Sequence, residues 1–280
     1  MLQPLKNPPM FTIISRRMLA ETIARFDIYA PLIARKRQPG NFVMVRANET
    51  AERIPLTLVD SDAQKGTITL IVQAVGKSTK HLLTLYADDM LLDVVGPLGN
   101  STPLTQGKHV VCVGGGVGTA ELYPIARGLK EKGNTLHTIV GGRTRELVIL
   151  EEEMRSCSDT LHITTDDGSY GRRGTVVDQL NELMASGTRL DAVYAIGPLP
   201  MMKAVANATR ASGLKTYVSM NALMVDGTGM CGGCRVSVGG EMKFACVDGP
   251  EFDGHTVDFD ELMMRNRTYT DLEKMADCRL

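Results

Sequence analysis

The chain has 280 residues, of which 43% are hydrophobic and 22% charged, and its formal net charge is −1. This composition is typical of a folded globular protein with two domains and room for a small third one. The balanced charge offers no basic surface to nucleic acid or to an anionic membrane. No apolar stretch approaches the roughly 20 residues that cross a bilayer, and Met1–Lys6 lacks the apolar core of a signal peptide. We therefore expect a cytoplasmic protein that binds neither nucleic acid nor membranes.

The first hundred residues are predicted to be all-β. Short runs of alternating apolar and polar residues lie at 11–15, 22–28, 42–45 and 67–72. Proline and glycine separate these runs. Many short strands with turn residues between them are typical of a β-barrel, which we expect over residues 1–103. One helix that starts near Lys77 is expected to interrupt it.

From Lys108 onward, strand-like and helix-like segments alternate. Each apolar run is followed by an amphipathic stretch, and the expected helices lie at 119–132, 147–154, 176–185 and 201–211. This alternation is typical of an α/β doubly wound domain with a parallel sheet, which we predict over residues 104–218. A glycine-rich module that ends in a short charged helix is predicted over residues 219–280.

A glycine-rich loop joins the first strand of the α/β region to its helix. It reads Gly114-Gly115-Gly116-Val117-Gly118-Thr119. Glycines at such a turn let a phosphate approach the backbone, and the free N–H groups at the helix start attract it. Thr119 stands where the usual Gly-x-Gly-x-x-Gly pattern ends in glycine, so the motif alone is weak evidence. Its place between a strand and a helix favours a dinucleotide site over a purely structural turn.

Two further polar loops follow the next two strands. The loop after the second strand carries Arg143, Arg145 and Glu146, and the loop after the third carries Asp166 and Gly168. Because the carboxyl ends of parallel strands meet at one edge of a sheet, ligands bind there. Ordinary turn chemistry also explains an Asp-Gly pair, but three such loops at one edge favour a binding site. An arginine tolerates the 2′-phosphate of NADP and an acidic residue binds the ribose of NAD, so the choice between them stays open.

Two segments of the predicted barrel carry groups that bind phosphate. Arg53-Ile54-Pro55-Leu56-Thr57 places an arginine and a hydroxyl on one strand, and Gly76-Lys77-Ser78-Thr79 opens the expected helix. An arginine, an ammonium, hydroxyls and backbone N–H groups together suit a diphosphate. From these residues alone, an exposed arginine and an N-capping serine are an equally good explanation.

The C-terminal module concentrates three of the six cysteines. Asp226-x4-Cys231-x2-Cys234, followed by Cys246, has the ligand spacing of a plant-type [2Fe–2S] loop, except that an aspartate stands in place of the first cysteine. No cysteine lies between Cys157 and Cys231, so one ligand must come from elsewhere. Asp226 has the required spacing, and Cys278 is the other candidate.

A structural zinc site is the alternative for these cysteines. His255 or Cys278 could complete a tetrahedral set with the three thiolates. The spacing of Asp226 from the first cysteine has no meaning for zinc, and this favours the iron–sulfur interpretation.

Together these segments resemble the ferredoxin–NADP reductase superfamily. The segments 53–57 and 76–79 resemble its FAD-binding half, and 114–119, 166–171 and 197–201 resemble its pyridine-nucleotide half. The cluster loop, with Asp248-Gly249-Pro250-Glu251-Phe252-Asp253-Gly254 behind it, is most similar to one branch of this superfamily. That branch holds the small (alpha) subunit of NADH-dependent reduced ferredoxin:NADP oxidoreductase and the beta subunit of sulfide dehydrogenase. The electron-transfer subunit of dihydroorotate dehydrogenase is a close relative.

The resemblance implies a set of residues that bind cofactors. For FAD they are Arg53, Pro55, Leu56, Thr57, Gly76, Lys77, Ser78 and Thr79. For the nicotinamide nucleotide they are Gly114, Gly115, Gly116, Gly118, Thr119, Arg143, Asp166, Gly168, Gly197, Pro198 and Met201. For the iron they are Asp226, Cys231, Cys234 and Cys246. Two positions depart from the wider superfamily, because Pro55 replaces an aromatic residue that packs on the flavin and Ile196 replaces a cysteine near the nicotinamide.

The resemblance also implies a function and a partner. We expect an electron-transfer flavoprotein subunit, an FAD- and [2Fe–2S]-dependent NAD(P)H oxidoreductase. It would form a heterodimer with a larger iron–sulfur flavoprotein and reach ferredoxin through this partner, as in electron bifurcation. No catalytic acid, base or nucleophile is predicted.

Two alternatives remain for the function. The first is the electron-transfer subunit of dihydroorotate dehydrogenase in pyrimidine synthesis, although the aspartate at position 226 speaks against it. The second is a non-catalytic nucleotide sensor with a zinc knuckle.

Overall fold

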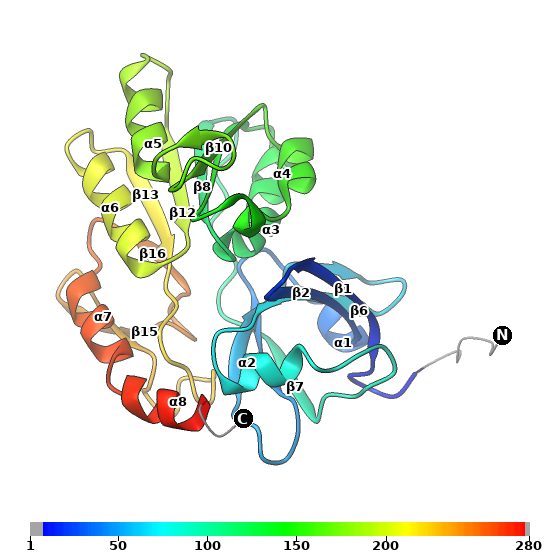
Figure 1. Ribbon diagram of the computed structural model, residues 1–280. Coiled ribbons are helices and arrows are strands. Elements are labelled where there is room, and N and C mark those ends of the chain that lie inside the picture. The colour runs from blue at the N-terminus through cyan, green and yellow to red at the C-terminus, as the bar shows by residue number, and fades with distance from the viewer. Residues whose placement is uncertain (1–7, 278–280) are drawn as a thin grey trace.

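The N-terminal strands form two antiparallel sheets (Figure 1). These strands are β1 (Ile13–Ala20), β2 (Ile23–Tyr29), β3 (Phe42–Arg46), β4 (Ile54–Thr57), β5 (Asp60–Asp62), β6 (Thr67–Gln73) and β7 (Asp93–Leu98). One sheet has the order β1-β2-β6-β5 and the other the order β4-β3-β7. The computed structural model describes residues 8–277. Two sequence-based predictions lie outside the described residues. They concern the absence of a signal peptide at Met1–Lys6 and a candidate metal ligand at Cys278.

The two N-terminal sheets enclose one apolar core. Phe26, Ile28, Ile68 and Leu70 alternate with polar residues along β2 and β6, and each is at most 3% exposed because successive side chains point to opposite faces of a strand. The predicted all-β region is therefore present. The two sheets do not join into one hydrogen-bonded ladder, so the predicted strands do not form a closed barrel. Two short helices accompany them, α1 (Pro31–Ala34) and α2 (Lys77–Leu82), and α2 starts where the sequence predicts.

A seven-stranded sheet forms the second half of the molecule. Its strands are β8 (His109–Gly115), β9 (Thr135–Gly142), β10 (Thr160–Thr165), β11 (Arg172–Arg173), β12 (Ala192–Ile196), β13 (Lys215–Ser219) and β16 (Glu251–Asp253). The order is β11-β10-β9-β8-β12-β13-β16, and all neighbours are parallel except β16, which is antiparallel to β13. This is the predicted doubly wound arrangement, with its switch point between β8 and β12.

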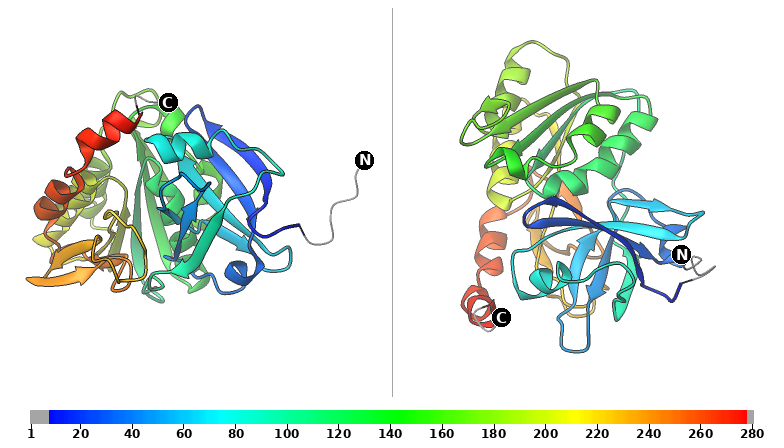
Figure 2. Two further views of the ribbon diagram at one scale, coloured as in Figure 1. Left: turned by 90° about the horizontal axis from the view of Figure 1, so that it is seen from below. Right: turned by 45° about the vertical axis from the view of Figure 1, so that its right-hand side comes forward.

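Helices cover both faces of this sheet (Figure 2). They are α3 (Gly118–Glu131), α4 (Glu151–Cys157), α5 (Val176–Ala185) and α6 (Leu199–Arg210). The central strands are therefore continuous apolar runs, and Val110–Val113 is fully buried. The helix predicted over 147–154 is shifted. A 3-10 turn occupies Arg145–Leu147, and α4 begins only after Leu150, whose left-handed backbone (φ 57°) separates the two.

The C-terminal residues connect the two halves. The hairpin of β14 (Arg235–Val238) and β15 (Glu241–Phe244) precedes β16, and two helices follow, α7 (Phe259–Asn266) and α8 (Thr270–Asp277), where the sequence predicts one. In Figures 1 and 2, α7 lies beside α6 and α8 lies beside α2. The predicted module 219–280 also contributes β16 to the sheet of the predicted second domain, and the domain limits stay a prediction.

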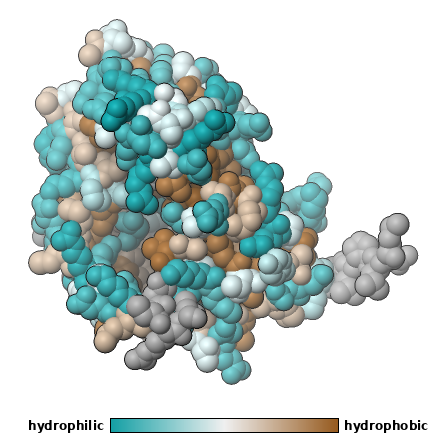
Figure 3. All heavy atoms as spheres, in the orientation of Figure 1, coloured by the Kyte–Doolittle hydropathy of each residue, from teal (hydrophilic) through white to brown (hydrophobic). Residues whose placement is uncertain are grey.

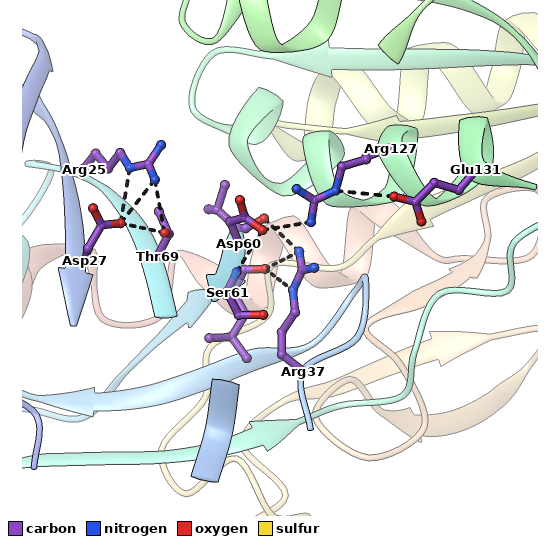
Figure 4. A network of polar contacts seen from close by, with 10 residues as sticks. Arg25, Asp27, Arg37, Asp60, Ser61, Thr69, Arg127 and Glu131 are labelled. Atoms are coloured by element: carbon purple, nitrogen blue, oxygen red, sulfur yellow. Dashed lines mark hydrogen bonds and ion pairs between the residues drawn. The ribbon is translucent and has the colours of Figure 1, made fainter. Parts of the chain in front are cut away.

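An ion network fixes the two halves against each other (Figure 4). The Arg127 guanidinium on α3 donates to Asp60 on β5 at 2.8 Å, and Arg37 donates to the Leu58 and Val59 carbonyls next to it. Burial, and then the charge of Arg127, lower the pKa of Arg37 to about 10. None of the helices in residues 8–277 is long and apolar enough to cross a membrane.

Candidate cofactor sites

The loops at the carboxyl ends of the parallel strands line a cavity of about 790 Å³, which we call the loop cavity. It opens in the hollow between the two halves of the molecule, where Figure 3 shows apolar side chains gathered. Most of the predicted nucleotide residues lie in its wall, and they are Gly115, Gly116, Gly118, Arg143, Asp166, Gly197, Pro198 and Met201. Gly114, Thr119 and Gly168 are not wall residues. Gly114 and Thr119 are buried behind the loop, and Gly168 packs on Arg173.

Close backbone contacts explain why glycines occupy this loop. A Cβ atom on Gly118 would lie 2.7 Å from the Cα atom of Gly197 and from the Ile196 carbonyl oxygen. A Cβ on Gly114 would meet the Thr119 hydroxyl at 3.0 Å. Gly116 has a positive φ of 55° and open space around it, as expected for a backbone that a ligand approaches closely. The start of α3 is thereby held against the β12–α6 turn at the switch point of the sheet.

The Gly76 turn lines a second cavity of about 800 Å³, which we call the turn cavity. Five of the residues predicted for FAD, Arg53, Gly76, Lys77, Ser78 and Thr79, contribute to its wall. The Thr79 hydroxyl accepts hydrogen bonds from the N–H groups of Val75 and Gly76, at 2.9 and 3.1 Å. This hydroxyl therefore shapes the turn, whereas Lys77 and Ser78 are available to a ligand.

Helix α8 closes the opposite side of the turn cavity. Thr270, Leu272 and Glu273 of α8 lie in its wall together with Leu223 and Val225 of the segment before the cysteine loop. Sequence reasoning did not find this wall, because nothing in a charged C-terminal helix indicates which cavity it covers.

The remaining predicted residues, Pro55, Leu56 and Thr57, line a smaller cavity of about 150 Å³. It lies where the N-terminal sheets meet the α/β half, and we call it the junction cavity. Ser219 and Asn221 line both this cavity and the loop cavity, and Met224 lines both this cavity and the turn cavity. The three cavities therefore adjoin.

Two acidic side chains that sequence reasoning missed face the junction cavity. They are Glu121 of α3 and Glu251 of β16. Burial raises the pKa of Glu121 to about 7, although a hydrogen bond with Thr57 opposes this shift. Burial also raises the pKa of Glu251 to about 8, and the charge of Glu121 adds to the effect. A glutamate in the first turn of a helix is usually a favourable partner of the helix dipole at the surface, so nothing in the sequence indicates that Glu121 is buried.

The predicted iron ligands lie on two segments. Asp226, Cys231 and Cys234 are on the loop between β13 and β14, and Cys246 is just after the β14–β15 hairpin. The Sγ atoms of Cys234 and Cys246 lie 3.2 Å apart in a buried position, whereas Cys231 is exposed. The Asp226 carboxylate accepts the N–H groups of Thr228 at 2.9 Å and of Cys231 at 2.8 Å. These hydrogen bonds lower the pKa of Asp226, and the bond from the Thr228 N–H has the largest effect. The carboxylate is therefore ionised at neutral pH.

The chemistry of these two segments fits an iron–sulfur cluster. They offer three thiols and one carboxylate, and the Gly233 N–H points at the Cys231 sulfur at 3.4 Å, as backbone groups do around cluster sulfurs. Within residues 8–277, however, no group of three or more potential ligands stands at metal-binding distance. The zinc alternative through His255 has no geometric support, because its Nε2 atom lies 3.0 Å from the Thr209 hydroxyl.

Comparisons with known proteins identify the family of this chain. Residues 221–258 match the family model described as the iron–sulfur cluster binding domain of dihydroorotate dehydrogenase B. The chain is 45% identical over 264 residues to a dihydroorotate dehydrogenase B (NAD(+)) electron transfer subunit homolog of Thermotoga maritima, covering 94% of this chain and 93% of that protein. It is 36% identical over 250 residues to the electron transfer subunit of Bacillus caldolyticus, covering 86% and 95%.

One solved structure is similar over nearly the whole length. It is a chain of the NADH-dependent reduced ferredoxin–NADP oxidoreductase, a structure described for flavin-based electron bifurcation. That chain is 43% identical, the TM-score is 0.93, and the match covers 98% of this chain and 99% of that one. The protein therefore belongs to the family of dihydroorotate dehydrogenase B electron transfer subunits and their homologues, iron–sulfur flavoprotein oxidoreductases with a ferredoxin reductase-like fold.

Proposed function

We propose that this chain passes electrons between NAD(P)H, FAD and a [2Fe–2S] cluster, and delivers them to a larger iron–sulfur flavoprotein. One observation carries the proposal. The cysteine loop meets the wall of the cavities that we assign to the flavin, because Met224 lines the turn and junction cavities and stands two residues before Asp226. A cluster held by this loop would lie beside the flavin, within the short range that electron transfer requires.

Packing fixes the cysteine loop in this place. Gly227 has a positive φ of 74°, and a Cβ atom there would lie 2.6 Å from the Met44 side chain and 3.0 Å from Leu98. Met44 and Leu98 belong to β3 and β7 of the N-terminal sheets. The loop therefore rests directly on the region that we assign to FAD, and it cannot move away without losing this contact.

Each cavity has a separate task in the proposal. Arg53, Lys77 and Ser78 bind the diphosphate of FAD in the turn cavity. Pro55, Leu56 and Thr57 face the ring end in the junction cavity. The loop cavity binds the nicotinamide nucleotide, and FAD, when bound, accepts a hydride and releases electrons singly. The residues of the chain contribute binding, orientation and exclusion of water.

The partner is expected to dock over the cysteine loop. Cys231 is exposed, and apolar side chains surround it, among them Met230 at 89% exposed and Val225 at 56%. Exposed apolar residues around a redox centre are typical of a protein interface. The relatives named as electron transfer subunits imply a larger partner, which we take to be an iron–sulfur flavoprotein in the cytoplasm that passes electrons to ferredoxin.

The structural match favours the bifurcating ferredoxin–NADP type over dihydroorotate oxidation. It covers 98% of this chain at 43% identity, whereas the Bacillus subunit covers 86% of this chain at 36% identity. The Thermotoga maritima homolog, at 45% identity, does not distinguish the two functions. The alternative remains the electron transfer subunit of a dihydroorotate dehydrogenase, and it is favoured by the family model over residues 221–258.

Anaerobic purification of the chain with its partner tests the proposal. We expect FAD, iron and sulfide in the complex, and an EPR signal of a reduced [2Fe–2S] cluster after addition of NADH or NADPH. Reduction by dihydroorotate would instead support the alternative. A colourless complex without flavin, iron or sulfide would contradict both.

A further inference from the structure

A protein that receives a hydride and passes on single electrons must also release a proton. A hydride consists of two electrons and one proton, whereas an iron–sulfur cluster takes electrons only. Each hydride that enters therefore leaves one proton behind in the cavity where it arrived. In the opposite direction, each hydride formed from two single electrons requires one proton. Where a bound nucleotide and flavin exclude water, an acid–base group of the chain can carry this proton.

Glu121 borders both cavities that the proposed function assigns to hydride transfer. It lines both the loop cavity, assigned to the nicotinamide nucleotide, and the junction cavity, assigned to the flavin ring. Its carboxyl group is hydrogen-bonded with the Thr57 hydroxyl of β4. Glu121 and Gly128 stand two helical turns apart on one face of α3, and Gly128 packs against Leu104 and Pro39. This face of α3 is therefore the one that meets the N-terminal half.

Glu251 stands behind Glu121 in the same cavity wall. Its Oε1 atom accepts a hydrogen bond from the Ser219 hydroxyl at 3.3 Å. Its Oε2 atom lies 3.1 Å from the position that a Cβ atom on Gly40 would occupy, so the side chain fills the space next to the bend at Gly40. The charged side chains in the walls of the loop and junction cavities are Glu121, Glu251, Arg143 and Asp166.

We infer that Glu121 accepts and returns the proton of the transferred hydride through the Thr57 hydroxyl, with Glu251 as the neighbouring acid. This inference rests on the proposed function. When the hydride is oxidised, its proton passes to the Thr57 hydroxyl oxygen. The hydroxyl's own proton passes at the same time to the Glu121 carboxylate. The two electrons leave one at a time for the cluster, and Glu121 ends as a neutral carboxylic acid. In the reducing direction every transfer is reversed, so that protons and electrons balance.

The protonation state of Glu121 suits this task. A group that both accepts and donates a proton near neutral pH works best when its pKa is close to that pH. Burial raises the pKa of Glu121 to about 7, and a negative charge on Glu251 would raise it further. Asp166 and Arg143 lie on the loops across the loop cavity and carry opposite charges, so they partly cancel each other.

Anaerobic stopped-flow of the intact complex tests the inference. NADH is mixed with wild type and with Glu121→Gln, and flavin bleaching and electron arrival at a one-electron acceptor are followed separately. We expect Glu121→Gln to change the rate of flavin bleaching by less than about 3-fold. The first electron should leave at the normal rate, and the second, which requires loss of the proton, should slow by about 100-fold, as for loss of an acid–base group.

Two controls separate a proton-carrying role from a structural one. Glu152→Gln removes an exposed carboxylate from α4, outside the lining of both cavities and of the ion network, and should change neither phase. Glu121→Asp keeps a carboxyl group and should restore most of the second-electron rate. The infrared difference spectrum between reduced and oxidised protein should show a carboxylic acid band on oxidation that is absent in Glu121→Gln.

The outcomes are distinct. An unchanged second-electron rate, or the same carboxylic acid band in Glu121→Gln, overturns the inference while flavin and cluster analysis leaves the proposed function intact. If Glu121→Gln loses its flavin, the infrared difference spectrum of wild type with isotope-labelled glutamate replaces the comparison. If the carboxylic acid band does not shift with the label, the inference is overturned. If the wild-type complex contains neither flavin nor cluster, the proposed function fails, and the inference fails with it.

Discussion

Asp226 has two roles that a single measurement must separate. In this structure its carboxylate accepts the N–H groups of Thr228 and Cys231 and thereby shapes the loop. The same carboxylate stands at the position from which the sequence pattern expects an iron ligand. If residue 226 only shapes the turn, an oxygen that accepts hydrogen bonds is sufficient. If it binds iron, it must supply a negatively charged carboxylate or thiolate.

Asp226→Asn and Asp226→Cys distinguish the two roles. Asparagine keeps an oxygen acceptor for the turn but loses the charge, so we expect a folded protein whose cluster is about 10- to 100-fold more weakly held. Cysteine loses the acceptor but supplies a thiolate, so iron content should be retained with a changed EPR spectrum and potential. Iron analysis and EPR measure both. Equal iron content and identical spectra in all three proteins would assign the fourth ligand to another residue.

Glu251 makes the stability of the cofactor-free protein depend on pH. Burial raises its pKa from 4.5 to about 8, so the folded state binds a proton more tightly than the unfolded state. The stabilisation is complete below pH 4.5, and it is lost as pH rises toward 8. We expect the free energy of unfolding to fall between pH 5 and 8 by at least about 1.4 kcal/mol, the equivalent of one pKa unit.

Urea unfolding of wild type and Glu251→Gln across this pH range checks the prediction. Glutamine keeps an oxygen for the Ser219 hydroxyl but does not titrate, so the dependence on pH should become flatter. The same slope in both proteins would show that Glu251 is not the group responsible.

At the scale of elements, the start of α3 is the most constrained junction. Gly118 begins this helix and touches the backbone of the β12–α6 turn at Gly197. The sequence predicts α3 within one residue, because a strong strand, a glycine loop and an amphipathic stretch follow each other. It places α4 several residues too early, because the left-handed backbone of Leu150 has no signal in a run of apolar residues.

Gly118→Ala tests this close contact. The new Cβ atom would lie 2.7 Å from backbone atoms that cannot rotate away, so we expect a loss of about 1–3 kcal/mol of stability and weaker binding of NAD(P)H. Gly76→Ala is the matched control, because no heavy atom lies within 4 Å of its Cβ position and its φ is not positive. Thermal unfolding and a nucleotide titration measure both variants. Equal stability of the two would contradict the packing argument.

At the scale of the whole molecule, the geometry between the halves decides whether the three cavities adjoin. The ion network of Figure 4 contributes to this geometry, because Asp60 on β5 lies between Arg127 on α3 and Arg37. Its carboxylate compensates two guanidinium groups, one of which is largely buried. Without that charge, the two arginines would repel each other across the contact between the halves.

Asp60→Asn is expected to loosen this contact. Because Asp60 and Arg127 are each about one-third exposed, solvent screening limits the loss to about 1 kcal/mol. High salt should reduce the difference from wild type. Asp62→Asn, on the same strand but paired with the exposed Lys65, is the control and should leave the urea midpoint unchanged. A larger effect of Asp62→Asn than of Asp60→Asn would contradict this assignment.

The sequence alone determined the chemistry that is local in the chain. Periodicity predicted the order of sheets and helices, and the spacing of Asp226, Cys231 and Cys234 indicated the cluster type, because ligands on one loop are close in sequence. The tertiary structure decided what depends on distant segments. The opening of the predicted barrel into two sheets, the wall that α8 gives to the turn cavity, and the meeting of Glu121 with Thr57 and Glu251 are examples. A carboxyl group becomes an acid–base group near neutral pH only through burial, and burial is created by packing between elements that the sequence does not juxtapose.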